Sequence, residues 1–312
     1  MSSKGPMAVR ELPPPGTEPT PVRVQNERPP DTNARRDVRL FTGLAHLVLA
    51  IWALIVIVPL LFTFLGSFKD TEEIFSSPFT LPHALRWDNW TRAWENAYVR
   101  QYLLNSVVVT FFGVAGTMLF GSLAAYTLAR YRFRGNRAIY YMFVSGMTFP
   151  VFLALVPLFF VVKNLGLLGT HTGLVLVYIS YSLPFTIFFL AAYFTTLPSE
   201  IAEAAFVDGC SHARTFFQIM LPMAKPAVVS LTIFNVLGQW NQYLIPLVLL
   251  PGNVQDKWVL PQGIASITTA AGNQADWGGL FAALSMSILP VLVIYVIFQR
   301  QIQAGLTSGA LK

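Results

Sequence analysis

The chain has 312 residues, of which 54% are hydrophobic and only 12% carry a charged side chain. A typical soluble domain has about 25% charged residues, so this composition excludes an ordinary soluble enzyme and a disordered chain. The mean hydropathy of +0.55 agrees with that exclusion. The net charge of +6 occurs in nucleic-acid-binding proteins and also in membrane proteins with basic loops, so the positions of the charges matter more than their sum.

Residues 1–39 differ in composition from the rest of the chain. They hold 8 of the 21 prolines and no aromatic residue. Such a segment cannot bury enough apolar surface to offset the entropy lost on ordering, so we expect a disordered cytoplasmic tail. It does not have the pattern of a signal peptide, because a proline-rich charged stretch precedes the first apolar run. Residues 40–312 are then predicted to form the transmembrane domain.

Six stretches of the chain contain no Asp, Glu, Lys or Arg, and each is long enough to cross the bilayer core as a helix of about 20 apolar residues. These stretches are 40–68, 101–129, 138–162, 164–199, 226–255 and 277–299. The sequence therefore predicts an all-α membrane protein with six transmembrane helices. The expected spans are 41–66, 103–129, 138–162, 174–195, 224–246 and 279–299.

The basic residues predict the orientation of these spans, because Lys and Arg gather in cytoplasmic loops. If the N-terminus is inside, the inside segments carry 15 of the 21 basic residues. Four arginines lie within 130–137 alone. We therefore expect a multi-pass protein of the cell membrane with both termini in the cytoplasm, and the excess of basic residues then reports topology rather than nucleic-acid binding.

Two connections on the predicted outer side are long. Residues 67–102 contain Trp87, Trp90 and Trp94, and these side chains are expected either to anchor the segment at the membrane interface or to bind a partner. Residues 247–278 are rich in Gly and Pro, and we expect a turn-rich loop that can reach a partner outside the membrane.

A cytoplasmic segment between the fourth and fifth spans, residues 197–222, differs from every other connection. Pro198 suits the first turn of a helix, and Gly209 can adopt the left-handed conformation that ends one. Ser211 is a good N-cap for a second helix that would continue to Pro222. The segment is thus predicted to form two short helices outside the spans.

This segment resembles the EAA loop of binding-protein-dependent ABC importer permeases. The resemblance is carried by Glu203-Ala204-Ala205, Asp208-Gly209, Ile219 and Leu221-Pro222. Further stretches are similar to the carbohydrate-uptake, maltose-type branch of that family: Ser67-Phe68-Lys69, Glu72-Glu73-Ile74, Asn105-Ser106, Trp240-Asn241-Gln242-Tyr243 and residues 298–310. The chain departs from the family pattern at Cys210, where alanine is usual. The resemblance covers residues 40–312.

The resemblance implies a permease subunit that forms part of the path for a sugar and is driven by ATP hydrolysed on separate subunits. The implied partners are a second permease subunit, two ATP-binding subunits, an extracytoplasmic solute-binding protein, the sugar and membrane lipid, and they include no nucleic acid. ATP and Mg would be bound by the ATPase subunits, and this chain would hold no cofactor. The resemblance does not specify the sugar beyond the expectation of an amino sugar or an oligosaccharide.

The resemblance also implies roles for residues in the coupling segment. Glu203 would contact a basic residue of the ATPase, small residues would allow close approach, and Phe206 would fill an apolar pocket. The implied coupling residues are Glu203, Ala204, Ala205, Phe206, Asp208 and Gly209.

Polar and aromatic residues late in the fifth span are candidates for the solute pathway, because amides bind hydroxyl groups and an aromatic ring can stack on a sugar. These candidates are Asn235, Gln239, Trp240, Asn241 and Gln242. A second interpretation places Trp240 and Tyr243 in an aromatic belt at the membrane interface.

Two other functions remain as alternatives. An ion-coupled secondary transporter usually keeps ionisable residues within its spans, whereas five of the six predicted spans lack Asp, Glu, Lys and Arg and the other has only Lys225, at its cytoplasmic edge. An intramembrane serine protease would need a base near Ser145, and the only histidine within a span is His46.

The sequence also lacks the usual motifs of metal and nucleotide sites. The histidines show no metal-ligand spacing, a single cysteine cannot form a disulfide within the chain, and no phosphate-binding Gly-rich loop occurs. The sequence thus predicts no catalytic residue and no metal site.

Overall fold

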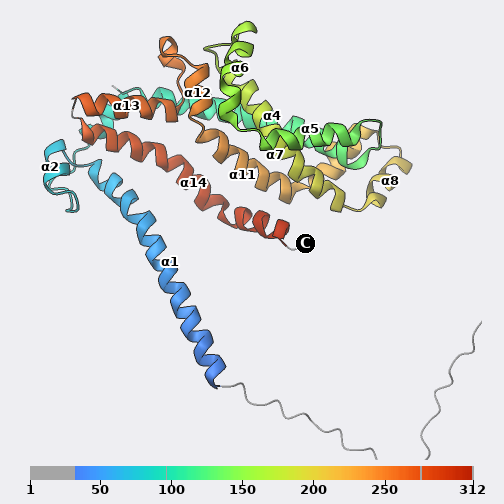
Figure 1. Cartoon of the computed structure of the whole chain (residues 1–312), viewed down its shortest axis with the longest axis horizontal. Coiled ribbons are helices and arrows are strands. Elements are labelled where there is room, and N and C mark those ends of the chain that lie inside the picture. Colours follow the sequence, from blue (N-terminus) through green and yellow to red (C-terminus); the bar gives the residue numbers. More distant parts are fainter. Residues whose placement is uncertain (1–31, 96, 275, 311–312) are drawn as a thin grey trace, which may run out of the picture. The chain divides into compact units, whose positions relative to one another are not determined.

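The computed structural model describes residues 32–95, 97–274 and 276–310, and the regular structure in these residues is helical (Figure 1). The part of the predicted tail formed by residues 1–31 lies outside the described residues. The first helices are α1 (Thr32–Gly66), α2 (Thr71–Ser76), α3 (Asp88–Glu95), α4 (Val99–Arg130), α5 (Asn136–Thr148), α6 (Val151–Asn164), α7 (His171–Thr196) and α8 (Ser199–Val207). They are followed by α9 (His212–Thr215), the π-helix η1 (Phe216–Met220), α10 (Leu221–Met223), α11 (Lys225–Trp240), α12 (Leu244–Leu249), the 3₁₀-helix η2 (Gly252–Lys257), α13 (Leu260–Gln274) and α14 (Trp277–Ala310).

The chain divides between Ile57 and Val58 into two compact units. The described part of the first unit is the N-terminal portion of α1. This helix begins at Thr32, so residues 32–39, which the sequence assigned to the tail, form its first turns. From residue 41 onward this portion carries no charged side chain, as expected for a membrane span.

Four helices are individually long and apolar enough to cross a membrane, within Phe41–Gly66, Val99–Arg130, His171–Thr196 and Trp277–Gln301. They cover four of the expected spans. Two bent helix pairs could each form one more, namely Asn136–Thr148 with Val151–Asn164 and His212–Met223 with Lys225–Trp240. By length and composition, the described part of the chain therefore holds four possible spans, or up to six if each bent pair crosses the membrane.

The span expected over 138–162 is not one straight helix. It consists of α5 and α6, which meet at an angle of 108°. Phe149 precedes a proline and has φ −82° and ψ 120°, because the proline ring disfavours helical backbone at the preceding residue. Pro150 itself has no N–H group with which to continue the hydrogen bonds of α5. The charge-free stretch predicted the apolar character of this segment but not its bend.

The span expected over 224–246 is also interrupted. Helix α11 ends at Trp240 and α12 begins at Leu244. Pro246 explains the interruption, because its ring would collide with the carbonyl of Gln242 in a continuous helix and it cannot donate a hydrogen bond to that carbonyl. The residues between the two helices, 241–243, form a short non-helical junction.

The centre of the second unit is the contact between α4 and α7, the most extensive helix pair in the fold. Helix α4 presents a buried stripe of small residues at every fourth position, made by Gly113, Thr117, Gly121 and Ala125. Small side chains let two membrane helices approach closely. A Cβ atom at Gly121 would lie only 2.8 Å from Cγ2 and 3.3 Å from Cβ of Thr186 on α7, which shows how near the two backbones are.

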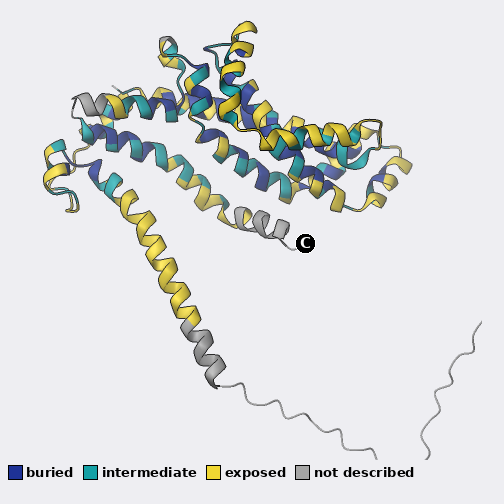
Figure 2. Cartoon of the chain, viewed as in Figure 1, coloured by how far each residue is buried: buried dark blue, intermediate teal, exposed yellow. Residues whose placement is uncertain are grey.

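The remaining helices of this unit pack around that pair. Helix α11 contacts both α4 and α7, and α14 contacts α11, α13 and α3. Helix α5 packs on α7 but contains no buried residue. Figure 2 shows exposed residues along α5 and α6, and buried ones concentrated in the helices of the bundle. The exposed apolar side chains of α5 and α6 suit contact with lipid or with another membrane-embedded subunit.

The close approach of α4 and α7 makes Gly121 intolerant of a side chain. We predict that Gly121→Val lowers the free energy of unfolding by about 1–3 kcal/mol, the usual cost of overpacking a core, because Thr186 is β-branched and cannot easily turn away. Thermal melting of the purified protein in detergent measures this loss. The matched control is Gly238→Val on α11, where an added Cβ meets nothing within 4 Å. Equal melting temperatures for the two variants would contradict this account.

Candidate coupling segment and polar helix junction

The segment predicted as two short helices begins with α8, which starts directly after Pro198. Its end has the geometry expected of a glycine stop. Gly209 has φ +79°, a conformation that residues with a Cβ rarely adopt. The Cys210 N–H donates to the Ala205 carbonyl at 2.9 Å, and the Gly209 N–H donates to the Phe206 carbonyl at 3.0 Å. Gly209 thus ends α8 and reverses the chain, which confirms that local prediction.

The second helical stretch begins at the predicted N-cap. The Ser211 side chain accepts a hydrogen bond from the Arg214 N–H at 3.4 Å, and α9 follows at His212. Helix α9 continues into the π-helix η1 and then into α10, which ends at Met223. A π-helical turn has a wider backbone than an α-helix, and the sequence had no signal for it.

Aromatic packing holds this second stretch against the transmembrane bundle. Phe216 and Met220 are buried in a cluster with residues of α4 and α7. The Tyr126 ring of α4 lies 5.1 Å from the Phe216 ring and 5.4 Å from the Phe194 ring of α7, measured between centroids. Edge and tilted ring pairs at these distances are favourable. The segment therefore rests on the ends of α4 and α7.

Two polar contacts add to this attachment. Arg130, the last residue of α4, donates through Nη2 to the Leu197 carbonyl at 2.5 Å, just before α8 begins. The Tyr131 hydroxyl and Nδ1 of His212 are hydrogen-bonded at 2.8 Å. Contacts thus fix both the start of α8 and the start of α9 to the C-terminal end of α4.

The predicted coupling residues lie on two different faces of α8. Glu203, Ala204, Asp208 and Gly209 are exposed, whereas Ala205 is 5% exposed. Ala205 therefore packs against this chain and has no free surface to offer a partner.

Phe206 is only partly accessible, because 37% of it is exposed and its ring centroid is 4.8 Å from that of His212.

Sequence reasoning missed Val207, which is 87% exposed. It lies four positions after Glu203, hence on the same helix face, and that spacing could have revealed it. An apolar side chain this exposed at the tip of the segment is a candidate contact for another subunit.

The solute-pathway candidates also separate into two groups. Asn235 and Gln239 are both 5% exposed and bind neighbouring helices. Asn235 Nδ2 donates to Thr186 Oγ1 at 2.9 Å. Gln239 Nε2 donates to Ser182 Oγ at 3.0 Å and to Thr117 Oγ1 at 3.3 Å. These two amides join α11 to α4 and α7.

Gly113 provides the space for this arrangement. A Cβ atom at position 113 would lie 2.3 Å from Oε1 of Gln239, so the glycine in the small-residue stripe accommodates the amide.

Trp240 is 6% exposed and packs in an apolar cluster with Tyr102, Leu260 and Ala283. It is therefore a core residue here rather than part of an exposed aromatic belt.

Asn241 and Gln242 form the other group, at the junction between α11 and α12. Asn241 is exposed, and among the described residues its side chain donates to the Leu237 carbonyl of α11 alone, at 2.8 Å. Gln242 is half-buried. In secondary transporters, broken helices with free polar groups at the break commonly bind the solute. Of the five candidates, these two have side chains available to a solute.

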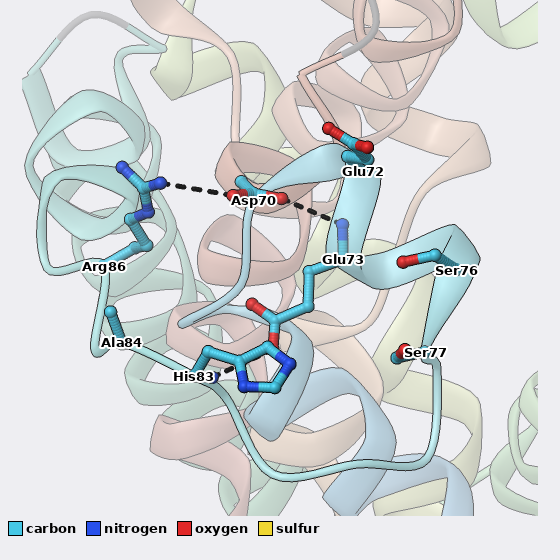
Figure 3. A pocket seen from close by; sticks show the side chains of 8 residues that line it. All are labelled: Asp70, Glu72, Glu73, Ser76, Ser77, His83, Ala84 and Arg86. Carbon is cyan, nitrogen blue, oxygen red and sulfur yellow. Dashed lines mark hydrogen bonds and ion pairs between the residues drawn. The ribbon is translucent and has the colours of Figure 1, made fainter.

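A polar pocket of about 240 Å³ lies between the end of α2 and the segment before α3 (Figure 3). Its groups already bind one another: the Glu73 N–H donates to Asp70 Oδ1 at 2.8 Å, and the His83 N–H donates to Glu73 Oε1 at 2.9 Å. Arg86 pairs with Asp70 at 3.2 Å. The backbone hydrogen bond from Glu73, followed by the charge of Arg86, holds the pKa of Asp70 below its ordinary value. This pocket stabilises the local fold.

Comparison with known proteins identifies the family. The profile of the "Binding-protein-dependent transport system inner membrane component" matches residues 117–308, from the middle of α4 into α14. The chain belongs to this family. It is a permease subunit of the ABC importer class, and it is a membrane protein with several spanning helices.

Two curated relatives and one solved structure illustrate the similarity. The diacetylchitobiose uptake system permease protein NgcG of Streptomyces coelicolor is 47% identical over 88% of this permease and 90% of its own length. The arabinooligosaccharides transport system permease protein AraQ of Halalkalibacterium halodurans is 33% identical over 89% of this permease and 99% of its own length. The structure of a bacterial ABC transporter involved in importing alginate contains a chain that matches with a TM-score of 0.74 and 25% identity, over 85% of this permease and 97% of that chain.

Burial distinguishes the amide side chains that hold the helices together from those that a solute can reach. We predict that Asn235→Ala lowers the free energy of unfolding of the permease by about 1–3 kcal/mol, because it leaves the buried Thr186 hydroxyl without its donor. Asn241→Ala, the matched control, removes an exposed side chain and should change that free energy by less than about 0.5 kcal/mol. Thermal melting in detergent distinguishes them. A larger loss for Asn241→Ala would reverse our assignment of the two amides.

Proposed function

We propose that this permease imports a sugar or oligosaccharide across the cell membrane, powered by ATP hydrolysed on separate subunits. The observation that carries the proposal is the family membership, together with curated relatives whose names specify diacetylchitobiose and arabinooligosaccharides as their solutes. The extent of the match to the diacetylchitobiose permease favours a short oligosaccharide that contains amino sugars. The central parts of the candidate spans lack charged side chains that would favour an ionic solute, and their Arg and Lys residues lie near the ends.

In this proposal the segment 197–223 is the coupling element. Its exposed face, formed by Glu203, Ala204, Val207 and Asp208, docks on an ATP-binding subunit, with Val207 in an apolar depression and the two carboxylates facing basic residues. Removing an exposed valine side chain from water is favourable by about 1.5–3 kcal/mol when it becomes fully buried. Because Tyr126, Phe194 and Phe216 pack together, the segment moves with the ends of α4 and α7 as one body.

The complete importer is proposed to contain this permease, a second permease, two ATP-binding subunits and an extracytoplasmic solute-binding protein. ATP and Mg belong to the ATP-binding subunits. The N- and C-termini lie in the cytoplasm, on the same side as the coupling segment. This orientation is supported by the four arginines within 130–137, which adjoin the segment through Arg130, since basic residues accumulate on the cytoplasmic side.

The solute path is proposed to pass the junction between α11 and α12. The side chains of Asn241 and Gln242 are available there, whereas Asn235 and Gln239 set the geometry of α11 through their buried hydrogen bonds. A neutral amide at a helix break can exchange hydrogen bonds with sugar hydroxyls without the cost of desolvating a charge. The junction therefore binds the sugar while the buried amides maintain the helix packing.

Uptake by the assembled transporter in proteoliposomes tests the proposed function. We expect accumulation of labelled diacetylchitobiose or a related oligosaccharide only when ATP and the binding protein are present. Loss of one hydrogen bond of about 1 kcal/mol in Asn241→Ala should raise the KM about fivefold. Asn164→Ala, at the exposed end of α6, is the matched control. Uptake driven by an ion gradient alone, without ATP, would instead support the secondary-transporter alternative.

Val207 offers a direct test of the docking face. Val207→Asp places a charge where the proposal requires an apolar contact, so we predict that the ATP-binding subunits no longer co-purify with the permease, while its amount in the membrane is unchanged. Ser199→Asp, two turns earlier on α8, is the matched control, because a carboxylate in the first turn is favoured by the helix dipole. Normal co-purification and normal sugar uptake with Val207→Asp would refute docking through this face.

A further inference from the structure

The chain between α1 and α3 turns back along the helix that it has just left. After α1 ends at Gly66, Lys69 is 1% exposed although it carries a charge. Its Nζ atom donates to the carbonyl of Ser77 at 2.7 Å, to the Thr80 hydroxyl at 3.2 Å and to the carbonyl of Pro78 at 3.5 Å. These three acceptors are neutral oxygens in one loop. Lys69 therefore holds that loop closed against the end of the span.

The closed loop reaches the level of the last turns of α1. The Phe79 ring lies 5.9 Å from the Phe62 ring, measured between centroids. Phe62 precedes the end of α1 by four residues, which corresponds to about 6 Å along the helix axis. Phe79 is thus beside the apolar part of a membrane-spanning helix rather than beyond its end.

The loop is apolar on its outer surface. Phe79 is 84% exposed, Leu81 74% and Phe75 64%. Residues 74–85 contain no Asp, Glu, Lys or Arg. Apart from the buried Lys69 ammonium, the charged groups of this region lie in the pair between Arg86 and Asp70 and in the pocket of Figure 3. The segment therefore combines exposed apolar side chains with polar residues, Ser76 and Ser77, that line the pocket.

Lys69 also pairs backbone carbonyl groups that would be costly to leave unpaired in lipid. Loops are rarely found in contact with hydrocarbon, because their carbonyl groups have no water to bind there and each unpaired group is costly. Lysine can place its ammonium group among such carbonyls while its methylene stem packs on apolar surface. With the carbonyls of Ser77 and Pro78 bound by Lys69, the apolar tip can enter a bilayer without leaving them unpaired.

We propose that residues 75–81 form a membrane anchor that inserts into the lipid leaflet at the C-terminal end of α1, and that Lys69 is the residue that keeps the anchor folded. The occupant of the exposed surface is lipid, because the loop lies beside the lipid-crossing part of α1, lacks Asp, Glu, Lys and Arg, and exposes Phe79 and Leu81. Phe and Leu side chains favour the bilayer over water. The anchor fixes the position of α2 relative to the membrane.

Fluorescence quenching in the assembled transporter tests the location of the anchor. A single cysteine at Phe79→Cys, in a Cys210→Ala background, is labelled with bimane in proteoliposomes. We expect brominated lipid to quench it at least twofold more strongly than aqueous iodide does. Glu72→Cys, on the exposed polar side of α2, is the matched control and should show the reverse order. Quenching of the Phe79 label mainly by iodide, or by neither quencher because another subunit covers it, would overturn the proposal.

A second pair of variants tests the role of Lys69. Lys69→Met keeps the length of the side chain and removes its donors, so the Phe79 label should become at least twofold more accessible to iodide. Lys163→Met, at an exposed site on α6, controls for the loss of a lysine elsewhere and should leave the label unchanged. Unchanged lipid quenching in Lys69→Met would show that the loop does not depend on this ammonium group. Both outcomes are independent of whether the transported solute is a sugar.

Discussion

The fold of this permease depends on satisfying polar groups where no water is available. Within a bilayer every unpaired donor or acceptor is costly. The chain pairs several such groups through buried side chains, although Gln239 Oε1 has no hydrogen-bond partner among the described residues. Asn235 and Gln239 of α11 bind hydroxyl groups on α7 and α4, across a contact that small residues on α4 make close. These amides join three helices by specific hydrogen bonds, whereas lipid and apolar side chains alone give little preference for one packing over another.

The same packing determines what the coupling segment can do. Tyr126 of α4 contacts Phe194 of α7 and Phe216 of η1, so the helix pair at the centre of the bundle and the segment outside it share one cluster. Arg130 binds the carbonyl that precedes α8. A force applied to the tip of α8 would therefore reach α4 and α7 directly. A flexible connection could not couple docking to a rearrangement of the spans, since coupling requires elements that move as rigid bodies.

Much of the fold follows from the sequence because charge is excluded from membrane spans. The charge-free stretches predicted where helices form, and Gly209 and Ser211 predicted the turn between α8 and α9 through well-understood backbone and capping preferences. The effect of proline was not predictable in the same way. Pro184 and Pro290 lie within helices, whereas Pro150 and Pro246 accompany breaks. Whether a proline breaks a helix depends on which neighbours satisfy the freed carbonyl groups, and that is a property of the tertiary structure.

In the candidate site, too, some features follow from the sequence and others depend on the tertiary structure. Composition predicted that amides in the fifth span matter, but only the packing separates the buried Asn235 from the exposed Asn241. Likewise the Glu-Ala-Ala pattern singled out the proposed coupling segment, while the burial of Ala205 and the exposure of Val207 depend on how α8 lies against the bundle. The sequence thus identified the elements, and tertiary contacts decided which side chain of each element is available to a partner.

The central claim is that the coupling segment and α4 move as one rigid body. Spin labels at Ser199→Cys on α8 and Phe111→Cys on α4, in a Cys210→Ala background, allow the distance between them to be measured by pulsed electron paramagnetic resonance in the assembled transporter. The account predicts the same distance distribution in the nucleotide-free and ATP-bound states. A clear shift in that distribution between the two states, in a transporter that still imports its solute, would contradict it.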